Sequence, residues 1–400
     1  MGLFDRFRRR DPKDEFAQAI LTAIRQRGWG GGLEYHRDRF EIRADKAVHY
    51  LGNIFRDYQA SNQDDRLGII EAASQFPFLQ KQAPPKDFDA AAPRLLSAVR
   101  NRFHLANWWM VEGLEATRGA HEKSQVVIAG PLAHFLVLEY DLGAAYVGDE
   151  QLGGWGVTLE EAGQVAVANL HARTELCCNH MDAGFFVCQT GDDYAAAPLL
   201  FPDMFDAMNL KGAPVAIVLS RRDLLVAGSE DREALVALAE SVESAFAAET
   251  RPISQCPIFF KDGAWRPFQP DPPIPAIDKL HLLQALCDYE EQKELLDGYH
   301  QRIGLDVYAA DLHGQQVADR YSTWTSWALG VDSLLPKADM IAMTGEEEVV
   351  LMRAWDDVMA LCGDLVIPAE GFLPSRWRVN HGPPPETWAA LKALPDPRIG

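Results

Sequence analysis

The chain has 400 residues and a net charge of −20, with 38 Lys and Arg against 58 Asp and Glu. Apolar residues make up 48%, enough to bury the cores of two or three domains of ordinary size. The acidic excess lies beyond residue 56. Because an acidic body repels polyanions, the composition argues against nucleic acid as a partner.

The cysteine content and the hydropathy of the sequence indicate in which cellular compartment the protein is expected. Six cysteines in 400 residues, without a framework spacing, argue against a disulfide-stapled secreted domain. The sequence holds no apolar run of the roughly 18 residues that a membrane span needs, and the N-terminus lacks the apolar segment of a secretory signal. We therefore expect a cytoplasmic protein with no integral membrane segment.

The first ten residues place Leu3, Phe4 and Phe7 on one helical face, beside four arginines. The pattern permits weak peripheral contact with a membrane surface. A short helix start is the favoured interpretation, because a single turn buries little apolar area.

The N-terminal third reads as helices and a hairpin. Apolar spacing predicts a helix over residues 14–27, which the glycine-rich segment 28–32 ends. Alternation predicts a strand or short hairpin over 33–43. A second amphipathic helix is expected over 48–58.

The middle of the chain alternates short strands with helices. Thr158 and Glu161 form a Thr-x-x-Glu capping box, which predicts a helix that ends near Leu170. Asp141 is expected at the end of a buried strand. Strands are expected at residues 134–140, 175–179, 184–189, 215–219 and 224–227, and in a hairpin over 258–267.

Five prolines between residues 267 and 275 mark the best domain boundary, because such a segment is stiff and extended. We expect an N-terminal helix and hairpin region (1–130), an α+β core (131–268), a proline-rich linker (269–275) and a C-terminal α+β domain (276–400). Helices and hairpins do not follow a βαβ rhythm. The predicted fold class is therefore α+β, with a mostly antiparallel sheet, packed helices and a smaller strand-rich C-terminal domain.

The middle of the chain contains a series of short sequence motifs with polar and aromatic residues. They are Asp141-Leu142-Gly143 with Tyr146, Leu152, Trp155, Thr158, Asn169-Leu170, Asp193-Tyr194, Leu199-Leu200, Arg222 to Val226, and Pro252-Ile253-Ser254. In this order and spacing, residues 131–268 resemble the YtpQ-like family of bacterial proteins, a family of unknown function. A longer form of the resemblance includes residues 51–53 and 95–102 nearer the N-terminus. The resemblance implies a folding unit and no particular activity.

Two positions depart from that family pattern. Ala197-Pro198 stands where a Ser-Arg pair is expected, and Ser220 stands where a proline often precedes the basic-Asp step. Any role of the Ser-Arg pair in relatives therefore does not carry over to this chain.

Cys177, Cys178 and His180, with Cys188 beyond a turn, are the most suggestive cluster for a metal. Three thiolates and an imidazole could hold zinc. However, adjacent cysteines in a strand point to opposite faces and cannot easily share one ion. We expect apolar cysteines on a sheet, no metal and no cofactor.

The turn formed by Arg221, Arg222 and Asp223 is the first choice for a ligand site, because charged loops held by rigid strands often carry function. An anionic ligand would suit the arginines, with Asp223 orienting one of them. The structural alternative is a tight turn closed by Asp223. Asn169 and Asp193 are the remaining candidate ligand-binding residues. The structural alternative for Asn169 is a helix C-cap, and that for Asp193 is a turn.

The residue pattern contains no coherent nucleophile, base or ligand set. We therefore expect a non-enzymatic binding or interaction protein with a protein partner. The alternative is a hydrolase-like enzyme that uses Asp193, Arg222 and Asp223, and whether the chain is an enzyme stays open at this point.

Overall fold

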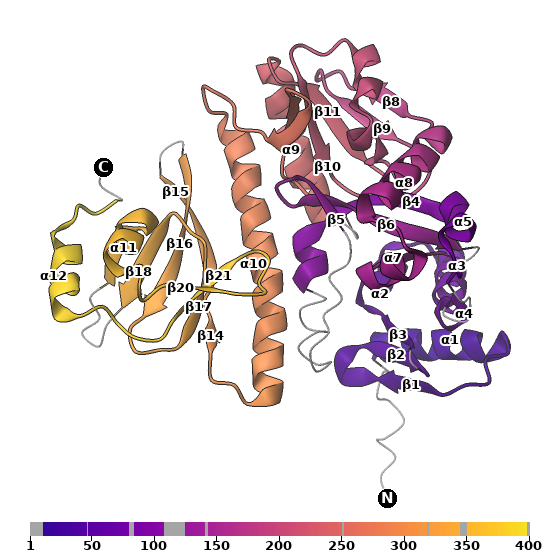
Figure 1. Cartoon of the computed structure of the whole chain (residues 1–400), viewed down its shortest axis with the longest axis horizontal. Helices are drawn as coiled ribbons and strands as arrows, with labels where there is room; N and C mark the ends of the chain where they lie inside the picture. The colour runs from indigo at the N-terminus through magenta and orange to yellow at the C-terminus, as the bar shows by residue number, and fades with distance from the viewer. Residues whose placement is uncertain are drawn as a thin grey trace, which may run out of the picture.

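The computed structural model describes residues 11–45, 47–79, 84–107, 125–140, 143–249, 252–317, 320–344 and 350–397. Helices pack against mostly antiparallel sheets and the C-terminal part is rich in strands, so the predicted α+β class is confirmed. The long helix α10 (Pro275–Ile303) stands between the C-terminal sheets and the rest of the molecule (Figure 1). None of the helices in the described ranges could cross a membrane. The first ten residues, with their predicted membrane contact, lie outside these ranges.

The N-terminal unit packs helices on a three-stranded antiparallel meander. Helix α1 begins at Pro12, where the Asp11 side chain accepts a hydrogen bond from the Lys13 amide, and it buries Phe16, Ile20 and Ile24 against the meander. The elements are α1 (Pro12–Gln26), β1 (Leu33–His36), η2 (Arg37–Arg39), β2 (Glu41–Ala44), β3 (Ala47–Tyr50), α2 (Gly52–Ala60), α3 (Gln63–Ala73) and α4 (Phe76–Leu79).

The helix predicted over residues 48–58 is wrong in its first part. Residues 47–50 form β3, which pairs antiparallel with β2, and α2 begins only at Gly52. Pairing with a neighbouring strand overrides the helical spacing of Val48 and Leu51, because so short an apolar pattern suits either structure.

The second sheet has the order β4-β6-β5, with β7 on the far side of β6, and α8 packs over β4. The predicted capping box is confirmed: Thr158 Oγ1 accepts from the Glu161 amide, and Glu161 Oε2 accepts from the Thr158 amide. Asp141 and Leu142 lie outside the described residues. The elements are α5 (Phe88–Ala91), η3 (Ala92–Arg94), β4 (Leu95–Asn101), a helical segment at 102–107, β5 (Gln125–Ala129), β6 (Leu132–Tyr140), β7 (Gly143–Tyr146), α7 (Asp149–Trp155) and α8 (Leu159–Arg173).

The third sheet is antiparallel throughout, with the order β13-β12-β10-β11-β9-β8. Alternation along β10 sends Val215 and Ile217 toward α9, and Ala216 and Val218 toward the second sheet. The elements are β8 (Cys177–His180), β9 (Phe186–Gln189), η4 (Ala197–Leu200), η5 (Pro202–Met208), β10 (Pro214–Val218), β11 (Leu224–Gly228), α9 (Arg232–Ala248), β12 (Ile258–Lys261) and β13 (Ala264–Pro267).

The proline-rich segment leads the chain back onto this core. Ile274, Ile277 and Leu280 are buried together with β10, β11 and α9. Further along α10, the Tyr289 hydroxyl donates to Ser375 O in the C-terminal part, at 2.9 Å. Helix α10 therefore belongs to two cores, and the division of the chain at residue 268 stays a prediction.

The C-terminal part contains two four-stranded sheets, β14-β17-β21-β20 and β15-β16-β18-β19. Strand pairs β14–β17 and β16–β18 are parallel, and the other pairs are antiparallel. The elements are β14 (Tyr308–Ala309), β15 (Leu312–Val317), β16 (Arg320–Ala328), β17 (Ser333–Pro336), β18 (Met340–Thr344), β19 (Val350–Ala354), α11 (Trp355–Cys362), β20 (Ile367–Ala369), β21 (Arg376–Val379) and α12 (Pro385–Ala393).

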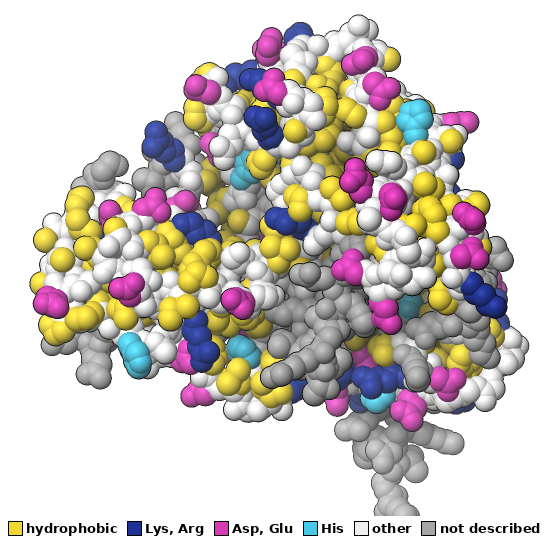
Figure 2. All heavy atoms as spheres, viewed as in Figure 1, with side chains coloured by type: hydrophobic (Ala, Val, Ile, Leu, Met, Phe, Trp, Pro, Cys, Tyr) yellow, Lys and Arg dark blue, Asp and Glu magenta, His cyan; other side chains and the backbone are white. Residues whose placement is uncertain are grey.

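Charged side chains of both signs are interspersed with apolar ones over the face shown in Figure 2. Many of the chain's basic groups are paired locally, as in Arg173 with Glu139 and Lys279 with Glu243. Such pairs reduce local repulsion within a chain of net charge −20.

Candidate functional site

The turn at residues 220–223 joins β10 to β11, as the sequence predicts. Ser220 Oγ donates to Asp223 Oδ2 at 3.1 Å and accepts from the Arg222 amide at the same distance. The Ser220 amide donates to Asp223 O at 3.3 Å. Asp223 therefore closes a tight turn, in agreement with the structural interpretation of this motif.

Asp193 lies beside the same turn. Its carboxylate is 3.9 Å from Arg221 Nη1 and 3.5 Å from Arg222 Nε, and Asp223 accepts a further hydrogen bond from Gln189 at 2.7 Å. Four of the five predicted residues thus line one cleft of about 670 Å³, together with side chains of α2 and α3. Their mutual contacts explain the arrangement without a ligand, although exposed ion pairs of this kind add little stability.

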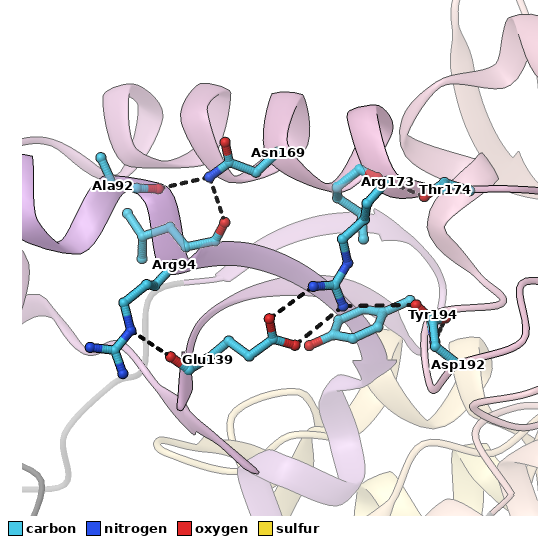
Figure 3. A network of polar contacts seen from close by, with 10 residues as sticks. Ala92, Arg94, Glu139, Asn169, Arg173, Thr174, Asp192 and Tyr194 are labelled. Atoms are coloured by element: carbon cyan, nitrogen blue, oxygen red, sulfur yellow. Dashed lines mark hydrogen bonds and ion pairs between the residues drawn. The ribbon is translucent and has the colours of Figure 1, made fainter. Parts of the chain in front are cut away.

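Asn169 has a different role. Helix α8 continues to Arg173, so Asn169 is not a C-cap, and its amide donates to Ala92 O at 2.7 Å and Leu95 O at 2.9 Å (Figure 3). Within the described part of the chain, no contact joins Asn169 to Asp193. Asn169 therefore fastens α8 to the start of β4.

Figure 3 also shows how α8 is held at its other end. Arg173 makes a two-pronged contact with Glu139, at 2.8 and 3.2 Å, and its guanidinium lies over the Tyr194 ring. Arg94 donates to Glu139 O at 2.9 Å. These contacts join α8 to β6 and to the segment before η4, so the network is structural.

A second cleft, which we call the central cleft, lies where several parts of the chain meet. It has a volume of about 640 Å³. The N-terminal meander, the end of β4 with the helical segment 102–107, the 220–223 turn and α10 all contribute to it. The polar lining includes His49, Tyr50, Arg56, Arg100, Asn101, His104, Tyr146, Arg221, Gln284, Asp288, Glu291 and Glu294.

Asp288 is the most buried acid in the central cleft, at 5% exposure. Asn101 Nδ2 and Gln284 Nε2 both donate to its Oδ1, at 3.2 and 2.9 Å. Gln284 is itself fixed, since its Oε1 accepts from Ser254 Oγ and the Gln255 amide. Amides from β4 and α10 therefore hold one oxygen of the carboxyl in place.

The other oxygen, Oδ2 of Asp288, has no hydrogen-bond partner in the described part of the structure, although the residue lines the cleft. Burial raises the pKa of Asp288 to about 7, despite the two amides that donate to its charged form. Near neutral pH this group therefore both donates and accepts protons.

His104 and Glu291 form an ion pair on the wall beside Asp288. Burial opposes protonation of the imidazole, but the hydrogen bond and the charge of Glu291 outweigh it and raise the pKa of His104. Arg221 lies close enough to oppose this charge. The pair supplies a fixed, partly buried dipole next to the Asp288 carboxyl.

Arg100 is a cation in the lining of this cleft, and no described carboxylate pairs with it. Within the described residues its one side-chain hydrogen bond runs from Nη1 to Val99 O, at 2.7 Å, and its Nε is buried without a hydrogen-bond partner. An acidic ligand that reaches the guanidinium of Arg100 would meet no competing carboxylate among the described residues.

Sequence reasoning missed Asn101, His104, Asp288 and Glu291. The only sequence signal is on α10, where the buried polar residues Gln284, Asp288 and Gln292 recur every four residues on one face. A buried polar stripe within a helix implies polar partners, but the sequence does not reveal which ones.

The predicted hairpin at the cysteine cluster is confirmed, and Cys178 stands directly opposite Cys188. The two form a disulfide, so the expectation of simple apolar cysteines on a sheet is wrong for this pair. A cross-strand register that brings the two Cα atoms within 4.1 Å accounts for the bond. Within the described ranges, no group of three or more His, Cys, Asp or Glu could hold a metal ion.

Another thiol and imidazole meet elsewhere: Cys256 Sγ lies 3.3 Å from His281 Nδ1. His281 Nε2 contacts Phe268 O at 2.8 Å, which makes Nε2 the donor and Nδ1 the acceptor. Burial raises the pKa of Cys256 to about 12. The sulfur is therefore a neutral thiol, whereas a nucleophile needs the thiolate, and we interpret this pair as part of the core.

No protein-family model, curated protein or solved structure matches this chain. The resemblance to the YtpQ-like family stays a prediction, and the site is interpreted from its own geometry.

Proposed function

We propose that the protein is a non-enzymatic binding protein for a small acidic molecule, and that the central cleft is its binding site. The supporting observation is that one cleft combines Oδ2 of Asp288, for which the described residues supply no hydrogen-bond partner, with Arg100, a guanidinium that no described carboxylate neutralises. The volume of about 640 Å³ lies within the usual range for small-molecule sites.

The two groups suit different ends of one ligand. Arg100 would pair with a carboxylate or phosphate, which guanidinium groups bind in a two-pronged manner. Asp288, with its pKa near 7, would form a hydrogen bond with a hydroxyl or amine of the same molecule. The ligand class is therefore a small acid that also carries a hydrogen-bond donor.

A small ligand suits this geometry better than the protein partner expected from the sequence, because the polar groups converge inside a cleft. The cytoplasmic location and membership of the YtpQ-like family remain part of the proposal. Neither changes the chemistry expected of the cleft.

The test is a thermal-shift screen with citrate, L-malate, L-glutamate and glycerol 3-phosphate, followed by calorimetric titration of any acid that stabilises the protein. A ligand at 100 times its Kd adds about 2.7 kcal/mol to the free energy of unfolding. We expect Arg100→Ala to weaken binding at least tenfold, because the acid group loses its charged partner.

Arg266→Ala is the matched control, since Arg266 is an exposed arginine on β13 and outside the cleft. Unchanged affinity in Arg100→Ala, or no stabilisation by any acid of the panel, would contradict the proposal.

A second candidate function is proton transfer to or from the bound molecule. The observation that favours it is the pKa of Asp288 near 7 beside the His104–Glu291 pair, because acid–base catalysts work best when their pKa lies near the working pH. Asp193 and Asp223 give less support to a hydrolase, since arginine, serine and glutamine side chains already engage them. Conversion of a bound acid that Asp288→Asn abolishes, with binding retained, would favour this second function.

A further inference from the structure

The C-terminal part contains a separate pocket of about 570 Å³, between the last turns of α10 and the sheet β14-β17-β21-β20. Its floor is apolar, with Leu296 and Leu334 almost fully buried and Phe372 packed against them. The exposed side chains of Leu305 and Ile367 stand at its mouth, at 46% and 56% exposure. The pocket shares no lining residue with the central cleft.

One buried side chain of the pocket, His300, has a ring nitrogen that is free to accept a hydrogen bond. His300 is 7% exposed, and its Nδ1 lies 2.8 Å from Val307 O. A carbonyl oxygen only accepts, so Nδ1 carries the proton and Nε2 of the neutral ring is an acceptor. In the described part of the structure, Nε2 has no partner, and the residue lines the pocket.

The charge at the rim is already balanced. Arg378 donates to both carboxylate oxygens of Asp332, from Nε at 2.8 Å and from Nη2 at 2.6 Å. A ligand therefore meets mostly apolar walls with His300 Nε2 as a buried acceptor, and the polar side chains of Tyr299, Glu370 and Asn380 also line the pocket. Because Arg378 is already paired, the pocket does not require an acidic group. This requirement differs from that of the central cleft.

We infer that this pocket binds a small apolar molecule that carries one hydrogen-bond donor, such as a substituted phenol or alcohol. The hydrocarbon part lies on Leu296, Leu334 and Phe372, and the donor binds His300 Nε2. Mostly apolar clefts of this size with a few placed polar groups are typical of small-molecule sites.

The test compares 4-propylphenol with its methyl ether by titration of the full chain. The two probes share the apolar part, but only the phenol has a donor. We expect both to bind, and the phenol to bind about three- to tenfold more tightly, as one net hydrogen bond provides. Equal affinities, or no saturable binding of either probe, would overturn the inference.

Two variants locate the site. Asparagine at position 300 retains a donor for Val307 O but lacks Nε2, so His300→Asn should abolish the preference for the phenol. Ala369→Trp should fill the pocket and abolish binding of both probes, whereas Ala264→Trp, at an exposed position on β13, should leave both affinities unchanged. Binding to Ala369→Trp at wild-type affinity would place the probes elsewhere and refute the assignment.

Discussion

Asp288 carries an ionisable group into a part of the molecule that water hardly reaches, since only 5% of the residue is exposed. Two amides hold Oδ1, but they do not offset the burial, and the pKa rises to about 7 from an ordinary value of 3.8. Ionisation of Asp288 therefore weakens the folded state as the pH rises. The arrangement suits a residue kept for binding, at some cost in stability.

The pH dependence of stability follows from the sign of this difference in pKa. Below about pH 4 the carboxyl is protonated in both states. Between about pH 4 and 7 only the unfolded chain ionises, so the contribution of Asp288 is lost as pH rises and levels off above 7. Because one unit of pKa corresponds to about 1.4 kcal/mol, the loss amounts to at most about 4 kcal/mol.

Asp288→Asn should remove this dependence, because an amide stays neutral and its oxygen still accepts from Asn101 and Gln284. Urea unfolding at about pH 5 and pH 8 measures this dependence. The free energy of unfolding of the variant, relative to that of the wild type, should be higher at pH 8 than at pH 5. Asp182→Asn, at an exposed turn, is the control. A stability difference that does not change with pH would show that Asp288 ionises normally in the folded protein.

Among the elements, α10 is fixed to the C-terminal sheets through one buried arginine. Arg376 is 1% exposed and donates to Gln292 Oε1 at 2.6 Å, to Ala310 O and Leu334 O at 2.9 Å, and to Tyr289 O at 3.3 Å. Burial lowers its pKa to about 10, which leaves it charged at neutral pH. Within the described residues only neutral oxygens accept hydrogen bonds from this cation, and Asp297 and Asp311 lie near enough to favour its charge.

Replacement of Arg376 should loosen this attachment. Arg376→Met removes four hydrogen bonds, although Leu334 O keeps the Ala310 amide as a donor, and we expect the free energy of unfolding to fall by about 3–5 kcal/mol. Arg376→Lys should lose less, since an ammonium keeps the charge but cannot reproduce the planar fork. Urea unfolding compares the two with Arg378→Lys, an exposed arginine two residues away on β21. If Arg376→Lys were as stable as the wild type, the planar guanidinium and its several hydrogen bonds would not be needed for this attachment.

Elements whose structure depends on residues close in the sequence can be predicted better than those that depend on distant contacts. The capping box at Thr158 and the strands expected at residues 175–179 and 184–189 depend on residues close together in the sequence, and both are confirmed. Strand β3 was mistaken for helix, because its pairing with β2 decides its structure. The central cleft escaped prediction, since Asn101 and Asp288 are 187 positions apart and neither is distinctive alone.

For the whole molecule, the position of α10 decides where the chain can be cut. Ile277 and Leu280 complete the core of the third sheet, so a fragment of residues 1–268 would leave this core open. A fragment of residues 1–304 keeps these contacts, and we expect it to melt cooperatively, unlike the shorter one. Circular dichroism melts of the two fragments measure this, and cooperative melting of both would support a domain boundary at residue 268.

Helix α10 spans 29 residues, which corresponds to about 44 Å, and it serves both sites from one rigid rod. Gln284, Asp288 and Glu291 line the central cleft, and Leu296, Tyr299 and His300 line the apolar pocket. One residue inserted between them, at Lys293, would turn one set by about 100° against the other. The number of residues between the two sites therefore fixes their relative orientation. Single substitutions along α10 leave this orientation unchanged, whereas an insertion or deletion would misalign one of the two sites.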